Sequence, residues 1–413
     1  MDMLKQTDPE VYKSIQAEIE RQQNQIELIA SENYCSRAVL QAQGSIMTNK
    51  YAEGYPDKRW YAGCKNVDDV EKLAIKRALD IFGAEHANVQ PHSGSSANMA
   101  VFFAMLSPGQ KILSMDLSHG GHLTHGFEKN FSGQFYKKIT YGVKKETGRI
   151  DYDEVMEIAK INNPHLIIAG ASAYPRELDF AKFKEIADEV NALFLADIAH
   201  IAGLIVAGVH QDPVPYADFV TTSTHKTLRG PRAGLILCKA KYAAKIDQMV
   251  FPGIQGGPLM HVIAAKAVAF KEAKTEEFKE YQRQIIKNAQ TLSHALKNKG
   301  YTLISGGTDN HLFLIDLTNK NLPGIEAQVI LEKAGISLNR NMIPFDKGSA
   351  FNPSGIRIGT PSVTTRGMKE SEMTQIAEWI NMAISNPDDK NLTLIKSKVA
   401  ELCSAFPIYK NTL

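Results

Sequence analysis

Between residues 83 and 238, short apolar runs of strand length alternate with segments whose apolar residues recur at helical spacing. Strands joined by helices form a mostly parallel sheet, because each helix returns the chain to the edge where the previous strand began. The expected strands are residues 87–90, 111–115, 135–143, 165–171, 193–197, 217–222 and 234–238. This order predicts an α/β fold with a mostly parallel seven-stranded sheet that binds ligands at the carboxyl ends of its strands.

We expect the chain to have three parts. Residues 1–65 form an N-terminal arm and an inter-subunit loop, residues 66–280 form the large α/β domain, and residues 281–413 form a smaller C-terminal α+β domain. Residues 8–29 predict an amphipathic helix, with Asp8 as its N-cap and a proline in its first turn. The aromatic-rich, irregular segment 29–64 indicates a functional loop or a subunit contact.

The balance of charged residues limits the kinds of partner that we expect the protein to bind. The 47 basic and 45 acidic residues leave a net charge of +2, which gives no overall field toward nucleic acid or anionic membranes. Four cysteines without a C-x-x-C pair predict free thiols in a reducing compartment. No apolar run is long enough to cross a bilayer, and the N-terminus lacks the apolar core of a signal peptide. We therefore expect a cytoplasmic protein that binds neither nucleic acid nor membrane.

A turn of small residues, Ser93-Gly94-Ser95-Ser96, follows an expected strand and opens an expected helix. Free backbone N–H groups, the helix dipole and small hydroxyls suit a phosphate at such a place. An ordinary helix cap is the more common meaning of these residue types. This turn, called the phosphate turn below, predicts a phosphate site only in combination with other groups.

Two ionisable side chains follow expected strands. Asp197 ends an apolar strand, where a buried carboxylate needs a cationic or N–H partner or else caps the next turn. Lys226 lies between two expected buried strands, where burial disfavours the ammonium and leaves a nucleophilic amine; alone it would more often be a solvated loop lysine. Phosphate turn, carboxylate and lysine, in this order, are the three groups that pyridoxal phosphate requires.

Three other residues are candidates for the same region. Ser172 follows the expected strand 165–171, and His200 follows Asp197 by three residues, so both could contact the same ligand. Arg357 lies in the apolar stretch SGIRIG, where an unpaired guanidinium would be costly. We therefore expect an anionic partner for it, from the protein or from a substrate.

The histidines His119, His122 and His125 allow a metal-site interpretation, because zinc sites use histidines at short spacings. Gly120 and Gly121 disfavour the helix that would align such ligands. No cysteine or carboxylate nearby in the sequence completes the set, so we expect no metal.

Longer runs of residues resemble the serine hydroxymethyltransferase family, whose members are pyridoxal-phosphate enzymes of the aspartate-aminotransferase fold (fold type I). These runs are LIASEN (28–33), NKYAEGYPDKRWYAGC (49–64), VQPHSGSSAN (89–98), LSHGGHLTHG (117–126), DIAHIAGLI (197–205), TTSTHKTLRGPRAG (221–234), FPGIQGGP (251–258) and SGIRIGTPSVTTRG (354–367). They span nearly the whole chain. The chain departs from the family at SAFNPSGIR (349–357), where bacterial members more usually have a Pro-Phe-Val-Thr version, and at Trp60 and Ala62, where Tyr and Gly are common.

The resemblance implies a role for each matching residue. Lys226 would hold pyridoxal phosphate, Asp197 would pair with its ring nitrogen, and His122 would stack on its ring. Further implied cofactor contacts are Ser93, Gly94, Ser95, Ser172 and His200, with Tyr51 and Gly257 from the neighbouring subunit.

Substrate roles are implied in the same way. Arg357 would bind the substrate carboxylate, with Ser31 assisting and His200 nearby. Glu53, beside Tyr61, would be the acid–base group, and His225 would tune reaction specificity. The implied folate site consists of Leu117, Gly121, His122, Leu123, Ser349, Ala350 and Phe351.

The resemblance therefore implies transfer of the serine hydroxymethyl carbon to tetrahydrofolate, with glycine as the other product, by a homodimer with shared active sites. A related alternative is a threonine-aldolase-like enzyme that cleaves β-hydroxy amino acids without folate. More distant alternatives are an RNA-binding regulator on an enzyme scaffold, against which the near-neutral charge argues, and a metal hydrolase.

Overall fold

The computed structural model describes residues 2–409. Grouped by compactness, the chain forms two units. One unit extends from Cys35 to Arg283, and the other combines the residues before Cys35 with those after Arg283. The expected domain boundaries after residues 65 and 280 stay a prediction. The two compact units are a different kind of division, in which the residues before Cys35 group with those after Arg283.

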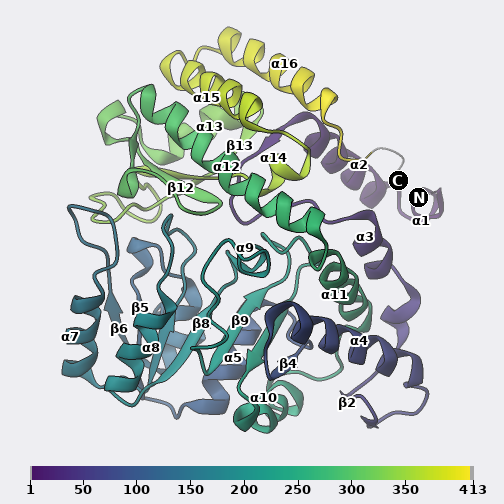
Figure 1. Ribbon diagram of the computed structural model, residues 1–413. Helices are drawn as coiled ribbons and strands as arrows, with labels where there is room; N and C mark the ends of the chain where they lie inside the picture. Colours follow the sequence, from purple (N-terminus) through teal and green to yellow (C-terminus); the bar gives the residue numbers. More distant parts are fainter. Residues whose placement is uncertain (1, 410–413) are drawn as a thin grey trace. The chain divides into compact units, whose positions relative to one another are not determined.

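The Cys35–Arg283 unit is built on a seven-stranded sheet (Figure 1), in the order β4-β10-β9-β8-β7-β5-β6. β10 pairs antiparallel with β4 and with β9, and the other described pairs of this sheet are parallel. The prediction of a mostly parallel sheet is therefore confirmed, and each expected strand is present within a few residues. The strands are β4 (His86–Asn88), β5 (Lys111–Met115), β6 (Lys137–Tyr141), β7 (Leu166–Ala169), β8 (Leu193–Asp197), β9 (Phe219–Ser223) and β10 (Gly234–Cys238).

Helices cover both faces of this sheet, with α8 on one face and α5 on the other (Figure 1). On β8, Phe194 stacks on Phe183 of α8, whereas the next residue, Leu195, belongs to the core cluster that includes α5. Every residue of β7, β9 and β10 is buried, as expected for strands covered on both sides. The helices are α3 (Arg37–Gln43), α4 (Lys65–Phe82), α5 (Gly94–Met105), α6 (Phe131–Phe135), α7 (Tyr152–Asn162), α8 (Phe180–Glu189), α9 (Ala202–Val206), α10 (Ala243–Gln248) and α11 (Met260–Ala273). A short hairpin, β2 (Gly54–Tyr55) with β3 (Lys58–Arg59), precedes α4.

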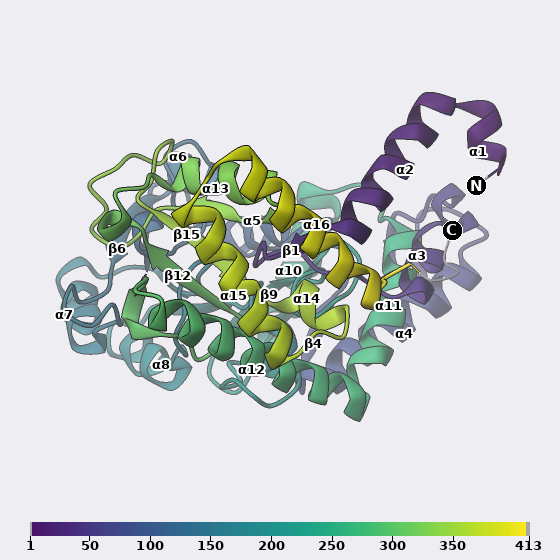
Figure 2. The same ribbon diagram turned by 90° about the horizontal axis from the view of Figure 1, so that it is seen from above.

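The second unit contains a four-stranded antiparallel sheet in the order β11-β12-β15-β14. Its apolar core includes residues of both the sheet and the helices, among them Phe313, Ile356 and Trp379. Helices α15 and α16 run side by side in this unit (Figure 2). The elements are β11 (Thr302–Leu303), β12 (Leu312–Asp316), α13 (Gly324–Lys333), β13 (Ile336–Ser337), β14 (Asn339–Asn341), β15 (Gly355–Gly359), α14 (Pro361–Thr365), α15 (Glu370–Ser385) and α16 (Asp389–Ala405), with α12 (Glu276–Asn298) leading in.

The N-terminal helices are α1 (Asp2–Thr7) and α2 (Pro9–Asn24). Asp8 caps α2 as expected, accepting from the backbone N–H of Val11 at 3.0 Å. The helix ends earlier than the predicted residue 29, because Ile26 and Glu27 form strand β1, which pairs with β13 in parallel. Among residues 2–409, no helix combines the length and the apolar character that a bilayer-spanning segment needs.

Arg366 joins the two ends of the chain inside the second unit. Its buried guanidinium donates to the carbonyls of Gln22 and Gln23 at 2.8 Å, and to those of Cys403 at 2.9 Å and Phe406 at 3.1 Å. These carbonyls lie at the last turns of α2 and α16, where a helix has acceptors without partners.

Replacing Arg366 by methionine is expected to destabilise the protein by about 3 kcal/mol or more, because each buried carbonyl left without a donor costs about 1–3 kcal/mol. The measurement is the urea midpoint of unfolding followed by far-UV circular dichroism. Lys398→Met, on the exposed face of α16, is the matched control and should leave the midpoint unchanged. Equal midpoints for both variants would contradict this role of Arg366.

Candidate active site

Asp197 is the last residue of β8, and its carboxylate is buried, with 8% of the residue exposed. One carboxylate oxygen, Oδ2, accepts from Asn98 Nδ2 at 2.8 Å and from His125 Nε2 at 2.9 Å; the other, Oδ1, accepts from the backbone N–H of Ala199 at 3.0 Å. Burial opposes ionisation of this group, but the interactions with His125 and His122 and the hydrogen bond from Asn98 hold the pKa of Asp197 well below its ordinary value. The structure therefore contains a buried carboxylate that is ionised at neutral pH.

Asn98, on α5, fixes the direction of these donations. Its amide oxygen accepts from the hydroxyl of Thr221 at 2.6 Å, so its nitrogen must be the group that donates to Asp197 and to Thr124 Oγ1, each at 2.8 Å. Neither Asn98 nor Thr124 was singled out from the sequence. Each donor of this amide has an acceptor, so the carboxylate is held in one orientation.

His122 lies beside this network, in a tight loop after β5. The ring nitrogen Nδ1 accepts from the backbone N–H of Thr124 at 3.2 Å, and burial lowers the pKa of His122 to about 4, so the ring is neutral near pH 7. Two glycines make the loop possible. A Cβ at Gly121 would lie 2.3 Å from the Met115 carbonyl oxygen. Gly120 has a φ of 115°, and a Cβ there would lie 2.9 Å from the Ala173 carbonyl oxygen.

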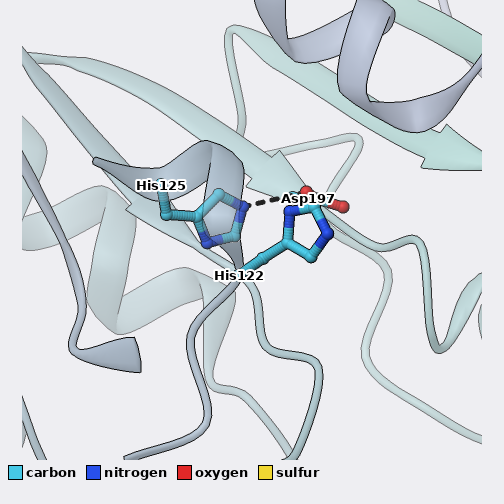
Figure 3. A group of neighbouring side chains, drawn as sticks. All are labelled: His122, His125 and Asp197. Atoms are coloured by element: carbon cyan, nitrogen blue, oxygen red, sulfur yellow. Dashed lines mark hydrogen bonds and ion pairs between the residues drawn. The ribbon is translucent and has the colours of Figure 1, made fainter. Parts of the chain in front are cut away.

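The structure corrects one reason given against a metal site, namely that no carboxylate completes the histidine set. Asp197 is that carboxylate, and one ligand atom from each of His122, His125 and Asp197 lies within 4.8 Å of the others (Figure 3). His119 is not part of the group, since its Nδ1 accepts from the backbone N–H of Val143 at 3.1 Å. Within the described residues, His125 Nε2 bonds directly to Asp197 Oδ2 at 2.9 Å, whereas His125 Nδ1 is buried without a hydrogen-bond partner.

Lys226 lies in the loop after β9 and is half-buried, whereas the sequence predicted burial. Its charge helps to lower the pKa of His122 and of His225, which places it within electrostatic reach of both rings. Burial, Arg232 and Lys226 lower the pKa of His225 to about 3, and Arg232 Nη1 lies 3.2 Å from His225 Nε2. His225 is therefore neutral and accepts from Arg232.

Two loops at the carboxyl ends of β8 and β9 are tied together. Thr227, next to Lys226, donates from its hydroxyl to the His200 carbonyl at 2.9 Å and accepts from the backbone N–H of Gly203 at 3.0 Å. Ile198 donates from its N–H to the Thr221 carbonyl at 2.9 Å. These bonds hold the segment after Asp197 against the segment that carries Lys226.

Ser172 lies at the end of the neighbouring strand, β7. Its backbone N–H donates to the Gly120 carbonyl at 2.8 Å, which connects it to the loop of His122. A Cβ at Gly170 would lie 2.4 Å from the Asp197 carbonyl oxygen, so only glycine permits this approach of β7 to the end of β8. The structure thus brings the predicted residues Ser172, His122, Asp197, His200 and Lys226 to one edge of the sheet.

The phosphate turn opens α5, as predicted. Ser93 and Ser96 form a capping box, in which each side chain accepts from the other's backbone N–H at 3.1 and 2.9 Å. Gly94 and Ser95 follow at the first helical positions, where N–H groups have no acceptor within the helix. The turn is both an ordinary helix cap and a place where an anion finds free donors.

Glu53, Tyr51 and Tyr61 form a second cluster in the same unit. The Tyr51 hydroxyl donates to Glu53 Oε1 at 3.3 Å, and the two tyrosine rings meet edge to face with centroids 5.1 Å apart. A Cβ at Gly257 would lie 3.4 Å from the Tyr51 ring, so this predicted residue joins the cluster. Tyr51 and Tyr61 are 56% and 48% exposed. Their accessible rings leave room for a contact with another molecule.

Arg357 and Ser31 belong to the other unit, which combines the residues before Cys35 with those after Arg283. Arg357, on β15, is 9% exposed; burial lowers its pKa to about 10, and its Nε donates to Asn339 Oδ1 at 3.1 Å. The residue before Ser31 crosses the end of this strand, since a Cβ at Gly359 would lie 2.4 Å from Ala30 Cα. Arg357 is thus the central residue of β15, and the segment that carries Ser31 passes the Gly359 end of the same strand.

The predicted folate residues lie in two places. Leu117, Gly121 and Leu123 lie in the same loop as His122, and Leu123 is 47% exposed. Ser349, Ala350 and Phe351 lie in an exposed loop of the other unit, with Phe351 84% exposed. Asp346 shapes this loop by accepting from Ser354 and from the backbone N–H of Gly348.

The donor chemistry at Asp197 fits pyridoxal phosphate. A carboxylate has about four lone-pair sites, and the described donors Asn98, His125 and Ala199 occupy three. A protonated ring nitrogen is a donor that would complete the set, and a neutral imidazole such as His122 can stack on an aromatic ring. A lysine amine and a turn with free N–H groups lie on the same sheet edge, so the residues match the cofactor.

A mostly parallel sheet that carries a lysine, an ionised carboxylate and a phosphate turn at its strand ends defines the class: a pyridoxal-phosphate enzyme of fold type I. The family model for serine hydroxymethyltransferase matches residues 4–380. The chain belongs to this family of pyridoxal-phosphate-dependent transferases.

Proposed function

We propose that the protein reversibly transfers the hydroxymethyl carbon of L-serine to tetrahydrofolate, giving glycine and 5,10-methylenetetrahydrofolate. Membership of the family supports this, and the ionised Asp197 carboxylate at the end of β8 is the observation that carries it. Pyridoxal phosphate, when bound, supplies an electron-accepting ring that favours cleavage of a bond at the substrate Cα.

The residues of the large unit hold the cofactor in this proposal. Lys226 supplies the amine that binds the aldehyde, Asp197 keeps the ring nitrogen protonated, and neutral His122 stacks on the ring. His125 and Asn98 hold Asp197 in its accepting orientation, because their donations fix one carboxylate oxygen. Further cofactor contacts are the phosphate turn (Ser93, Gly94, Ser95), Ser172 and His200.

The substrate residues bind and move protons. Arg357 binds the substrate carboxylate, since a guanidinium presents paired donors to a planar anion, and Ser31 assists. Glu53, beside Tyr61, holds the proton of the serine hydroxyl, and neutral His225 tunes specificity. The folate site consists of Leu117, Gly121, His122, Leu123, Ser349, Ala350 and Phe351.

The exposed tyrosine cluster supports a homodimer in which Tyr51 and Gly257 complete the partner's site. A cytoplasmic location and the absence of nucleic-acid or membrane partners complete the proposal. The near-neutral net charge of +2 supports the absence of nucleic-acid and membrane partners.

Glycine release from L-serine is expected to be at least about tenfold slower without tetrahydrofolate, corresponding to about 1.4 kcal/mol in the barrier. The measurement is the rate of glycine formation by the purified, cofactor-loaded protein with and without folate. A rate that does not depend on folate would contradict the proposal and favour folate-independent cleavage of β-hydroxy amino acids. Threonine as the substrate, without folate, serves as the comparison.

A further inference from the structure

Lys266 of α11 is buried in the large unit, with only 1% of the residue exposed. Its ammonium donates to three backbone carbonyls: Val89 at 2.6 Å, Gly234 at 2.7 Å and Pro91 at 3.1 Å. A buried lysine is costly, and an apolar side chain of similar volume would avoid that cost. The three backbone carbonyls that accept from the ammonium therefore indicate what the charge contributes to the structure.

Two of these carbonyls, those of Val89 and Pro91, belong to the segment that immediately precedes the phosphate turn. The Pro91 carbonyl points to the ammonium, and the N–H of the same peptide unit, from His92, donates to Gln255 Oε1 at 3.1 Å. Gln255 also donates to the Gln90 carbonyl at 3.0 Å. The peptide unit between Pro91 and His92, just before the phosphate turn, is thus held from both sides.

The third carbonyl ties the phosphate turn to the sheet. Gly234 begins β10, and its backbone N–H donates to the Pro91 carbonyl at 3.0 Å. A Cβ at Gly234 would lie 2.1 Å from the Ser93 carbonyl oxygen and 3.1 Å from the Gly94 nitrogen. Lys266 therefore spans the contact between β10 and the residues that enter the phosphate turn.

Only the protonated amine offers three donors, so the arrangement requires the ammonium. Burial lowers the pKa of Lys266 to about 7, and Glu71 of α4 opposes this shift. Glu71 is itself bound by Arg59 and by Gln90 Nε2. His92 is the other titratable group near the amine, and burial together with the charge of Lys266 lowers its pKa.

We propose that Lys266 is a positioning residue for cofactor binding: by gathering the carbonyls of Val89, Pro91 and Gly234, it holds the phosphate turn in the conformation that binds the cofactor phosphate. The inference rests on the proposed function, because it takes the phosphate turn as the site of the pyridoxal phosphate anion. It adds a residue from outside the turn that never touches the cofactor.

The test compares two cofactor forms on cofactor-free protein. Lys266→Met is expected to weaken binding of pyridoxal phosphate by about tenfold or more, which is about 1.4 kcal/mol, and to change binding of pyridoxal, which lacks the phosphate, by less than about twofold. Both affinities are measured by absorbance titration. Lys271→Met, at an exposed position of the same helix, is the matched control and should change neither affinity.

A merely structural lysine would give a different result. If Lys266→Met bound both forms as wild type does, or lost affinity for both equally, the inference would be overturned. Should Lys266→Met not fold, Lys266→Gln keeps two amide donors without the charge and should show a smaller loss confined to pyridoxal phosphate. A wild-type protein that binds neither form would refute the proposed function itself rather than this inference.

Discussion

Replacing Lys226 by alanine is expected to lower turnover by at least about 10³-fold, the scale on which removal of a covalent catalytic group acts. The purified variant should also lose the yellow absorbance of covalently held pyridoxal phosphate. The physical reason is that, in the proposed function, Lys226 supplies the amine at the edge of the sheet where Asp197 and His122 lie. Turnover and the visible spectrum are measured on the same preparation.

The control for this variant is Lys245→Ala, which removes an exposed lysine of α10. It should keep both the colour and wild-type turnover. A Lys226→Ala protein that stayed yellow and active would show that another residue holds the cofactor.

Asp197→Asn is expected to have the second largest effect, because both carboxylate oxygens already accept hydrogen bonds. Wherever the amide nitrogen is placed, it faces a donor, either Ala199 N–H or the pair Asn98 and His125. Removing one partner of a buried charged network costs about 3–5 kcal/mol. At about 1.4 kcal/mol per factor of ten, a loss of this size in the reacting complex lowers turnover by a factor of about 10² to 10⁴. Cofactor affinity should fall in the same variant.

The pH dependence of stability gives a second readout for Asp197. A carboxyl whose folded-state pKa is lowered adds stability above its unfolded pKa of about 3.9, and this stability is lost as the pH falls below that value. The difference in unfolding free energy between wild type and Asp197→Asn should therefore shrink below about pH 4. Asp188→Asn, at an exposed position of α8, is the control and should behave as wild type in both assays. A difference that stayed constant with pH would contradict the assigned ionisation of Asp197.

The strands of the large sheet could be predicted because their apolar runs are continuous and separated by helical spacing. The expected strand 193–197 matches β8 in full, whereas the expected strand 135–143 shortens to Lys137–Tyr141, since α6 takes the residues before it. The early end of α2 could not be predicted, because its cause, the pairing of Ile26 with Ile336, is a long-range contact.

The site could be predicted only as far as residue types at strand ends allow. Asp197 and Lys226 stand out because charged groups follow apolar runs. His125 was considered only as a metal ligand, because its partner Asp197 is distant in the chain and only the sheet brings them together. The role of Lys266 could not be predicted, because a lysine within a helical segment is normally solvated. Its three carbonyl acceptors come from two other segments of the chain.

The pairing of β1 with β13 has a consequence for biosynthesis. Residues before Cys35 leave the ribosome first, but their packing partners lie after Arg283 and emerge last. At about 5–20 residues per second, the N-terminal segment waits some tens of seconds, during which the Cys35–Arg283 unit can already fold. Nascent chains arrested before Ile336 should therefore expose the N-terminal segment to proteases, and chaperones that bind it would act before chain release.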